Sequence, residues 1–231
     1  LPSVKVSKNL SQVVEKFLIF GGLPLQLRQG QAKEKLREIS LVVERGFELM
    51  SVDNSAIADT IRVEMARLQS AEFTYQNILN LTRLRRRETV NAVLDDLINH
   101  GYLFKKKPLI LDGAKQTYLS VFSYTDPGIA RYLDPDLENR PGAQLEGYLH
   151  SRLEFLIRNS PFKSALHYYK PYTLDDKQTL RFLPGEIDFV ISYGKRLIPI
   201  EAKLSSDISN IETGTLIQFL KNNAAPFGVV L

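Results

Sequence analysis

The stretch Pro184–Lys203, PGEIDFVISYGKRLIPIEAK, decides the fold of this chain, because it reads as two β-strands joined by a tight Gly-Lys turn. Each strand carries charge among its apolar residues: Asp188 in the first, and Glu201 with Lys203 in the second. Since side chains alternate between the faces of a strand, each strand is expected to turn its apolar residues to a core and its acids to the other face. The apolar face of the first strand is predicted to consist of Ile187, Phe189 and Ile191.

The turn determines which residues of the two strands face each other. Glycine tolerates the positive φ that two-residue hairpin turns require, so Gly194 and Lys195 are expected at its centre. Asp188 then lies directly opposite Glu201, with the bases of the two side chains about 5 Å apart. Lys203 follows one pleat further along, on the same face.

Two carboxylates this close repel each other unless a cation lies between them. A divalent ion such as Mg²⁺ prefers carboxylate and water ligands, and it leaves positions for a phosphate oxygen and a nucleophilic water. The ammonium of Lys203 could orient that water or offset charge that develops on the phosphorus. The pattern therefore predicts a phosphodiester-cleaving site. The alternative is an ion pair of Asp188 with Lys203 or an arginine on a solvated sheet face.

A fourth candidate residue, Glu146, lies in the segment QLEGYLHSRLEFLI. Helical spacing puts it on one face with Leu149, Leu153 and Ile157, so its side chain is expected to point toward the interior. An inward glutamate without a partner is costly, and the acidic sheet face with its metal would supply that partner. The alternative is a glutamate at the helix edge that reaches solvent or an arginine.

The composition is that of a globular protein. The 231 residues are 44% hydrophobic and 24% charged, with a net charge of +4 and a pI of about 9.1. The absence of cysteine excludes disulfides and cysteine-based zinc sites, and it fits a cytoplasmic location. No apolar run approaches the roughly 18 residues of a membrane span, so no membrane partner is expected.

Three regions separate by pattern, and together they predict a mixed α/β fold. Residues 1–52 carry apolar residues at helical spacing, interrupted by Gly-Gly-Leu-Pro at 21–24, and are expected to form a helical segment. Residues 53–133 have the order of a winged helix-turn-helix. Residues 134–231 mix helices and strands and end in FGVVL, which reads as an unfinished strand; a longer protein is expected.

The winged helix-turn-helix prediction rests on the order helix, helix, turn, helix and hairpin. Its third helix is expected over ETVNAVLDDLINHGYLF, with Gly101 ending it. The two hairpin strands are predicted at residues 108–112 and 116–122, with a turn at 113–115 between them.

With Glu146, Asp188, Glu201 and Lys203 in this order, the third region resembles the PD-(D/E)XK nuclease superfamily, whose domain is restriction-endonuclease-like. The resemblance implies that the three acids hold Mg²⁺ and that Lys203 assists the attacking water. The sequence departs from the family at the first strand, where Ile187 rather than proline precedes Asp188.

Nearly the whole chain is also similar to the C-terminal half of a group of prokaryotic AAA-type ATPases, through FLIFGGLP, SYTDPGIARYL, LEGYLHSRL and the hairpin. The similarity implies an ATPase domain outside these residues as a partner, and a homo-oligomer as a possible assembly. No G-x-x-x-x-G-K-[ST] loop occurs in the chain itself. Asp126 and Gly128 match a D-x-G step of that group, and Gln218 follows Glu-x-Lys where some nucleases keep a glutamine.

A basic stretch precedes the third helix of the second region. Arg83, Arg85, Arg86 and Arg87 lie where a winged helix meets the DNA backbone, and Lys105, Lys106 and Lys107 could add contacts from the wing. The alternatives are a solvated charged turn and a protein-docking surface.

Two functions follow from these patterns. The first is Mg²⁺-dependent cleavage of DNA by an endonuclease-like domain that a winged helix positions. The second is a catalytically silent module that binds DNA or a protein as part of the larger ATPase.

Overall fold

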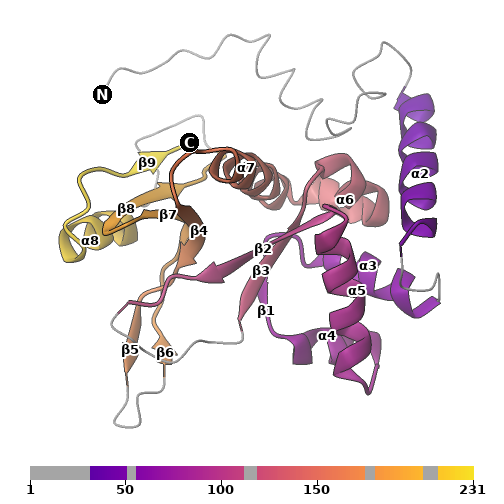
Figure 1. The fold of residues 1–231 in the computed structure, drawn as a ribbon, viewed down its shortest axis with the longest axis horizontal. Coiled ribbons are helices and arrows are strands. Elements are labelled where there is room, and N and C mark those ends of the chain that lie inside the picture. Colours follow the sequence, from indigo (N-terminus) through magenta and orange to yellow (C-terminus); the bar gives the residue numbers. More distant parts are fainter. Residues whose placement is uncertain (1–31, 51–55, 112–118, 175–179, 205–212) are drawn as a thin grey trace.

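A computed structural model of the chain describes residues 32–50, 56–111, 119–174, 180–204 and 213–231 (Figure 1). These residues form a mixed α/β structure with seven α-helices and a seven-stranded mixed sheet. The described part therefore has the predicted fold class. None of its helices is both long enough and apolar enough to cross a membrane.

The elements follow one another in an order close to the predicted one. The helices are α2 (Ala32–Glu48), α3 (Ala56–Arg67), α4 (Tyr75–Thr82), α5 (Arg87–Asn99), α6 (Pro127–Leu133), the 3-10 helix η2 (Pro135–Asn139), α7 (Pro141–Arg158) and α8 (Gly214–Asn222). The strands are β1 (Glu72–Phe73), β2 (Leu103–Pro108), β3 (Ser120–Tyr124), β4 (Ser164–Tyr169), β5 (Tyr172–Leu174), β6 (Leu180–Phe182), β7 (Ile187–Tyr193), β8 (Arg196–Glu201) and β9 (Val229–Val230). The helix expected to end at Gly101 is α5, and Gly101 has a φ of +75° just beyond it.

The large sheet has the strand order β1-β3-β2-β4-β7-β8-β9, and β5 and β6 form a separate two-stranded ribbon. The pairs β2–β4 and β8–β9 are parallel, and the other pairs are antiparallel. Strand β2 pairs with β3 through its first four residues and with β4 through its last two. The sheet therefore runs without a break from the second predicted region into the third, although α6 ends at the expected boundary near residue 133.

The hairpin strands of the second region lie at other positions than predicted. The first, β2, begins at Leu103, five residues before the predicted start, and takes in the three consecutive lysines. The second, β3, ends at Tyr124 rather than at residue 122, and the predicted turn at 113–115 lies outside the described residues. The lysines hide the strand from a hydrophobicity pattern, because only Leu103, Lys106 and Pro108 of β2 are buried.

The β7–β8 hairpin has the predicted register. Tyr193 pairs with Arg196, and the ladder continues to Phe189 opposite Ile200. Gly194 in the turn has a φ of +57°, which is the left-handed conformation that favours glycine. Asp188 and Glu201, which the sequence predicts to face each other, are the next residue of each strand beyond this last pair.

The predicted apolar face of β7 is wrong at one residue. Between the pairs His167–Val190 and Tyr169–Ile187, β7 has two residues, Asp188 and Phe189, and β4 has one. This extra residue is a β-bulge, which reverses the alternation of side chains beyond it. Ile187 consequently packs with Val190 rather than with Phe189.

Helices cover both faces of the β7–β8 part of the sheet (Figure 1). Helix α7 packs its predicted stripe, Leu149, Leu153 and Ile157, against the cluster that contains Phe189 and Ile200. Helix α8 packs Leu216 and Phe219 on the other cluster. A third and larger core joins α2 through α6 with β1, β2 and β3.

The turn glycine gives a test of the register. Replacing Gly194 with alanine is expected to lower the free energy of unfolding by about 1 kcal/mol, because a side chain is unfavourable at this φ. A Cβ at Gly194 would meet no atom within 4 Å, so the loss is conformational. Urea denaturation measures it.

The control is Gly142→Ala in the first turn of α7, where a Cβ also meets no atom within 4 Å and φ is not positive. We expect no loss of stability in this variant. Equal stability of Gly194→Ala and the wild type would contradict the described turn.

Candidate active site

The four residues predicted from the sequence line one cavity of about 620 Å³. Glu146 comes from α7, Asp188 from the bulge in β7, Glu201 from the last position of β8, and Lys203 from two residues further on. The other lining residues come from the turn after α3, the loop before β7 and the start of α8: Ser70, Gly185, Glu186, Gly214, Thr215 and Leu216.

Asp188, Glu201 and Lys203 are joined by short contacts. The Ala202 amide donates to Asp188 Oδ2 at 2.7 Å, which ties the acid of one strand to the backbone of the other. Lys203 Nζ donates to Glu201 Oε1 at 2.7 Å. The other carboxylate oxygen, Glu201 Oε2, is buried and has no hydrogen-bond partner among the described residues.

Strand β9 holds the backbone of the Glu-x-Lys segment. The amide of Leu231 donates to the Glu201 carbonyl at 2.9 Å, and the amide of Lys203 donates to the Leu231 carbonyl at 2.9 Å. This parallel pairing fixes where Glu201 and Lys203 leave the sheet.

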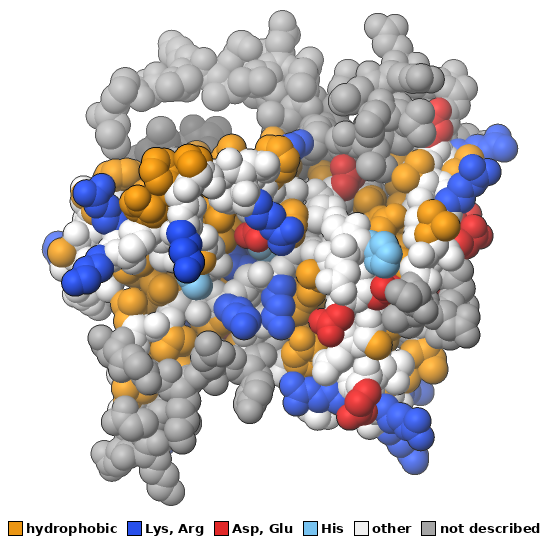
Figure 2. Space-filling view, viewed as in Figure 1, with side chains coloured by type: hydrophobic (Ala, Val, Ile, Leu, Met, Phe, Trp, Pro, Cys, Tyr) orange, Lys and Arg blue, Asp and Glu red, His pale blue; other side chains and the backbone are white. Residues whose placement is uncertain are grey.

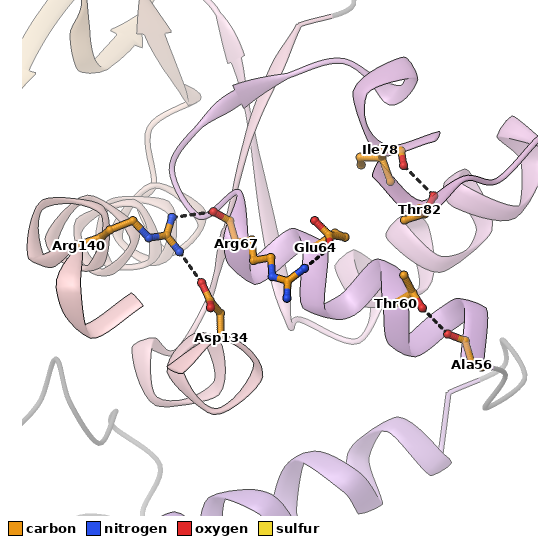
Figure 3. A network of polar contacts seen from close by, with 8 residues as sticks. All are labelled: Ala56, Thr60, Glu64, Arg67, Ile78, Thr82, Asp134 and Arg140. Carbon is orange, nitrogen blue, oxygen red and sulfur yellow. Dashed lines mark hydrogen bonds and ion pairs between the residues drawn. The ribbon is translucent and has the colours of Figure 1, made fainter. Parts of the chain in front are cut away.

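Helix α7, which carries Glu146, is anchored at its N-terminal end (Figure 3). Arg140 donates through Nη1 to the Arg67 carbonyl at 2.6 Å and through Nη2 to Asp134 Oδ2 at 2.5 Å. Ser70 Oγ adds a hydrogen bond to the Ala143 carbonyl at 3.1 Å. The position of Glu146 is therefore set by contacts with the end of α3.

The pKa values of the three glutamates that line the cavity, Glu146, Glu186 and Glu201, are raised. Burial, reinforced by the Asp188 charge and opposed by Lys106, raises the pKa of Glu146 to about 7. Burial also raises the pKa of Glu201, although the hydrogen bond from Lys203 opposes it. The same hydrogen bond raises the pKa of Lys203, so this amine stays charged.

Lys106 was expected on the DNA-binding surface, and the structure buries it instead. Its side chain is 4% exposed, and its Nζ donates to the main-chain carbonyl of Asp188 at 2.5 Å. Burial lowers the pKa of Lys106 to about 8, against the opposing charges of Glu146, Asp188 and Glu186. A contact of this amine with the DNA backbone does not fit such burial.

Lys106 also neighbours the acids, which the sequence patterns did not predict, whereas alternation along the strand places Glu186 on the face of Asp188. Glu186 lines the cavity beside Asp188, and Lys170 lies 3.8 Å from its carboxylate. The alternation of side chains along a strand at residues 103–108 would place Lys106 on the opposite face from Lys105 and Lys107. This inference is possible only if the strand at these residues is itself predicted.

The three acids expected to hold Mg²⁺, Glu146, Asp188 and Glu201, all line the cavity. Among the residues that the structure describes, no group of three or more His, Cys, Asp or Glu side chains is placed to hold a metal ion. Carboxylates are suitable donors for Mg²⁺, and the buried Glu201 Oε2 has an unused acceptor.

Of the weaker sequence matches, Asp126 has a structural role and Gln218 lies outside the lining of the cavity. Asp126 caps α6, since its Oδ1 accepts hydrogen bonds from the Gly128 amide at 2.8 Å and from the Ile129 amide at 3.3 Å. Gln218 is exposed on α8 and is not among the lining residues of the cavity.

The arginines predicted to contact DNA are exposed around the turn between α4 and α5. Arg83 ends α4 with a φ of +56°, Arg86 precedes the first residue of α5, and all four arginines at 83 and 85–87 are exposed. Figure 2 shows basic side chains at this end of the molecule, interspersed with acidic ones. Lys107 is also exposed.

Tyr75 links this surface to β2. The Arg87 guanidinium lies 4.9 Å from the centre of the Tyr75 ring. Lys105 Nζ donates to the Tyr75 hydroxyl at 3.1 Å. Neighbouring lysines of β2 thus lie in different surroundings: Lys105 contacts Tyr75, and Lys106 lies beside the acids.

The raised pKa of Glu146 predicts how stability depends on pH. The unfolded chain releases this proton near pH 4.5 and the folded chain near pH 7, so the folded state binds more protons between these values. The free energy of unfolding should therefore fall as pH rises from about 4.5 to about 7. Glu146→Gln should make this fall shallower, with Glu186 and Glu201 supplying what remains.

Urea denaturation at several pH values measures the effect. Glu88→Gln, at an exposed position in the first turn of α5, is the control and should keep the wild-type pH dependence. An unchanged slope in Glu146→Gln would show that this carboxyl is not desolvated in the folded protein.

Comparison of the chain with protein-family models, with curated proteins and with solved structures finds no significant match. Any assignment of function therefore has to come from the residues of the cavity and of the α4–α5 surface.

Proposed function

We propose that the chain is a DNA-cleaving module that requires a divalent cation, with a nuclease-like domain of the PD-(D/E)XK type. The observation that supports this most directly is the gathering of Glu146, Asp188, Glu201 and Lys203 around one cavity. These residues come from a helix and two paired strands, in the order that the superfamily resemblance implies. Mg²⁺ is the expected ion, and an ATPase domain outside these residues is the expected partner.

Lys203 is suited to act on a phosphate group. When water attacks a phosphodiester, a P–O bond forms, the bond to the leaving oxygen breaks, and negative charge has to be stabilised. The Lys203 side chain is 40% exposed and its amine is held by one carboxylate oxygen of Glu201. The amine can therefore meet a phosphate that enters the cavity while its stem stays in place.

Asp188 and Glu201 supply fixed negative charge to the lining of the cavity. Asp188 is held by the Ala202 amide, and the Glu201 side chain is 8% exposed. Fixed acceptors of this kind hold a cation or a water without reorganisation during the reaction. Among the described residues, no group of three or more acidic, histidine or cysteine side chains is placed to hold the divalent ion.

We propose further that residues 53–133 act as a winged helix-turn-helix that binds DNA without sequence preference. Support comes from the four exposed arginines at the α4–α5 turn and from the exposed Lys107. Arginines at such a turn can neutralise several phosphates, which gives binding that weakens as salt rises.

A second candidate function is a catalytically silent module that binds DNA or protein within the larger ATPase. Two observations favour it: the lack of a ready metal-binding group among the described residues, and the buried ammonium of Lys106 beside the acids. Cleavage assays separate the two candidates.

The catalytic proposal predicts the outcome of plasmid nicking. The wild type should convert supercoiled DNA to the nicked form with Mg²⁺ or Mn²⁺ and not with EDTA. Asp188→Asn and Lys203→Met should each slow nicking by about 100-fold or more, because each loses a charge at the reacting group. The measurement is the initial rate of nicking on an agarose gel.

Lys195→Met is the matched control, since Lys195 is an exposed lysine in the turn of the same hairpin. It should nick at the wild-type rate. If Asp188→Asn and Lys203→Met nicked as fast as the wild type, the activity would belong to a contaminant and the silent module would be the better description.

The DNA-binding proposal predicts a change in salt dependence. Replacing Arg85 and Arg86 with glutamate should weaken binding to duplex DNA and reduce the slope of log affinity against log salt by about 1 to 2, at roughly 0.9 for each lost phosphate contact. Fluorescence anisotropy at several salt concentrations measures both quantities.

The control replaces Lys195 and Arg196 with glutamate, which changes net charge equally at the exposed end of the β7–β8 hairpin. This variant should keep most of the wild-type slope. An unchanged slope in the Arg85 and Arg86 variant would indicate that the turn docks a protein instead.

A further inference from the structure

Lys106 is a buried ammonium without a carboxylate in direct contact in the described structure. Its Nζ donates to the Asp188 carbonyl at 2.5 Å and lies 3.9 Å from the centre of the Phe189 ring. The Tyr168 ring is also near, with its centre 5.8 Å away. A charge in such surroundings is strongly unfavourable unless nearby opposite charges compensate it.

The compensating charges are the acids of the candidate active site. The carboxylates whose fields act on Lys106 are those of Glu146, Asp188 and Glu186. All three line the cavity, and Lys106 does not, so the ammonium lies behind the cavity wall. The interaction benefits both sides, because several acids in one pocket repel each other unless a cation is close.

The contact with Asp188 also has a structural effect. Lys106 donates to the main chain at the β-bulge of β7, where Asp188 and Phe189 face a single residue of β4. A bulge leaves backbone groups without their usual ladder partners. The ammonium therefore supplies both a hydrogen bond for the bulge and a positive charge for the acids.

We propose that Lys106 is a resident counter-cation of the acidic cavity: it positions Asp188 through the bulge carbonyl, and it weakens the binding of a divalent cation to Glu146, Asp188 and Glu201. The inference rests on the proposed function only in taking the cavity as the place where that cation binds. Lys106 is a positioning residue, since it touches neither the cavity nor a substrate.

The first test is the binding of Mn²⁺ alone to the 231-residue chain, measured by electron paramagnetic resonance. Lys106→Met should bind Mn²⁺ at least about tenfold more tightly than the wild type, because the repulsion between two nearby cations is removed. A merely structural role predicts the opposite direction, since a damaged cavity binds more weakly. Unchanged or weaker Mn²⁺ binding by Lys106→Met would overturn the proposal.

Lys105→Met is the matched control for this test. Lys105 is the neighbouring residue of β2, and its amine donates to Tyr75 rather than approaching the acids. Its Mn²⁺ affinity should equal that of the wild type. Tighter binding in this variant as well would mean that only the overall charge matters, and it would also overturn the proposal.

The second test needs no metal and therefore separates this inference from the proposed function. Urea midpoints are compared for Lys106→Met, Glu146→Gln and the double variant. If Lys106 compensates Glu146, the double variant should lose less stability than the two single losses combined. Additive losses would overturn the proposal even in a protein that cleaves DNA.

Poor folding of Lys106→Met does not leave the proposal untested. Mn²⁺ should then raise the thermal unfolding midpoint of this variant more than that of the wild type, because the ion takes over the lost compensation. Lys106→Gln, which keeps a donor for the Asp188 carbonyl, should respond in the same direction. Equal Mn²⁺ shifts in all three proteins would refute the role of the charge.

The outcomes also distinguish this inference from failure of the proposed function. Absence of nicking by the wild type, together with tighter Mn²⁺ binding by Lys106→Met, would disprove cleavage and support the counter-cation. Nicking that depends on Asp188, together with unchanged Mn²⁺ binding by Lys106→Met, would support cleavage and show that Lys106 does not act as a counter-cation.

Discussion

The repulsion between the carboxylates that line one cavity is the constraint on which the rest of this structure depends. Glu146, Asp188 and Glu201 come from separate elements and line one cavity. Such a group is unstable by itself, because each charge raises the cost of ionising the others. Two amines offset this repulsion: Lys203 lies within the cavity, and Lys106 lies behind its wall. The sheet order, with β2 beside β4 and β4 beside β7, is what brings the second amine there.

The sequence predicted the parts of this arrangement that depend on short-range rules. The turn at Gly194 and Lys195 determined the β7–β8 register, because hairpin pairing follows directly from which residues occupy the turn. The stripe of α7 was predictable for the same kind of reason, since helical spacing alone assigns Leu149, Leu153 and Ile157 to one face. Both features are set within a single element or a single hairpin.

The parts that the sequence did not predict depend on contacts between distant segments. The bulge at Asp188 and Phe189 exists only relative to β4, so the pattern of β7 alone assigned Ile187 to the wrong face. Strand β2 was misplaced because its lysines resemble a solvated turn. The role of Lys106 could not be inferred without the pairing of β2 with β4, which no local pattern encodes.

The separation along the chain between Lys106 and the bulge it contacts affects how the molecule is assembled during translation. Lys106 is made 82 residues before Asp188. A nascent chain that has left the ribosome only through β3 therefore keeps this amine hydrated, since the strand that will cover it has not been synthesised. Contacts of such long range are slow to form, because a large loop must close first. The acidic pocket is accordingly a late product of folding, and newly made chains cannot carry its chemistry until the final hairpin has docked.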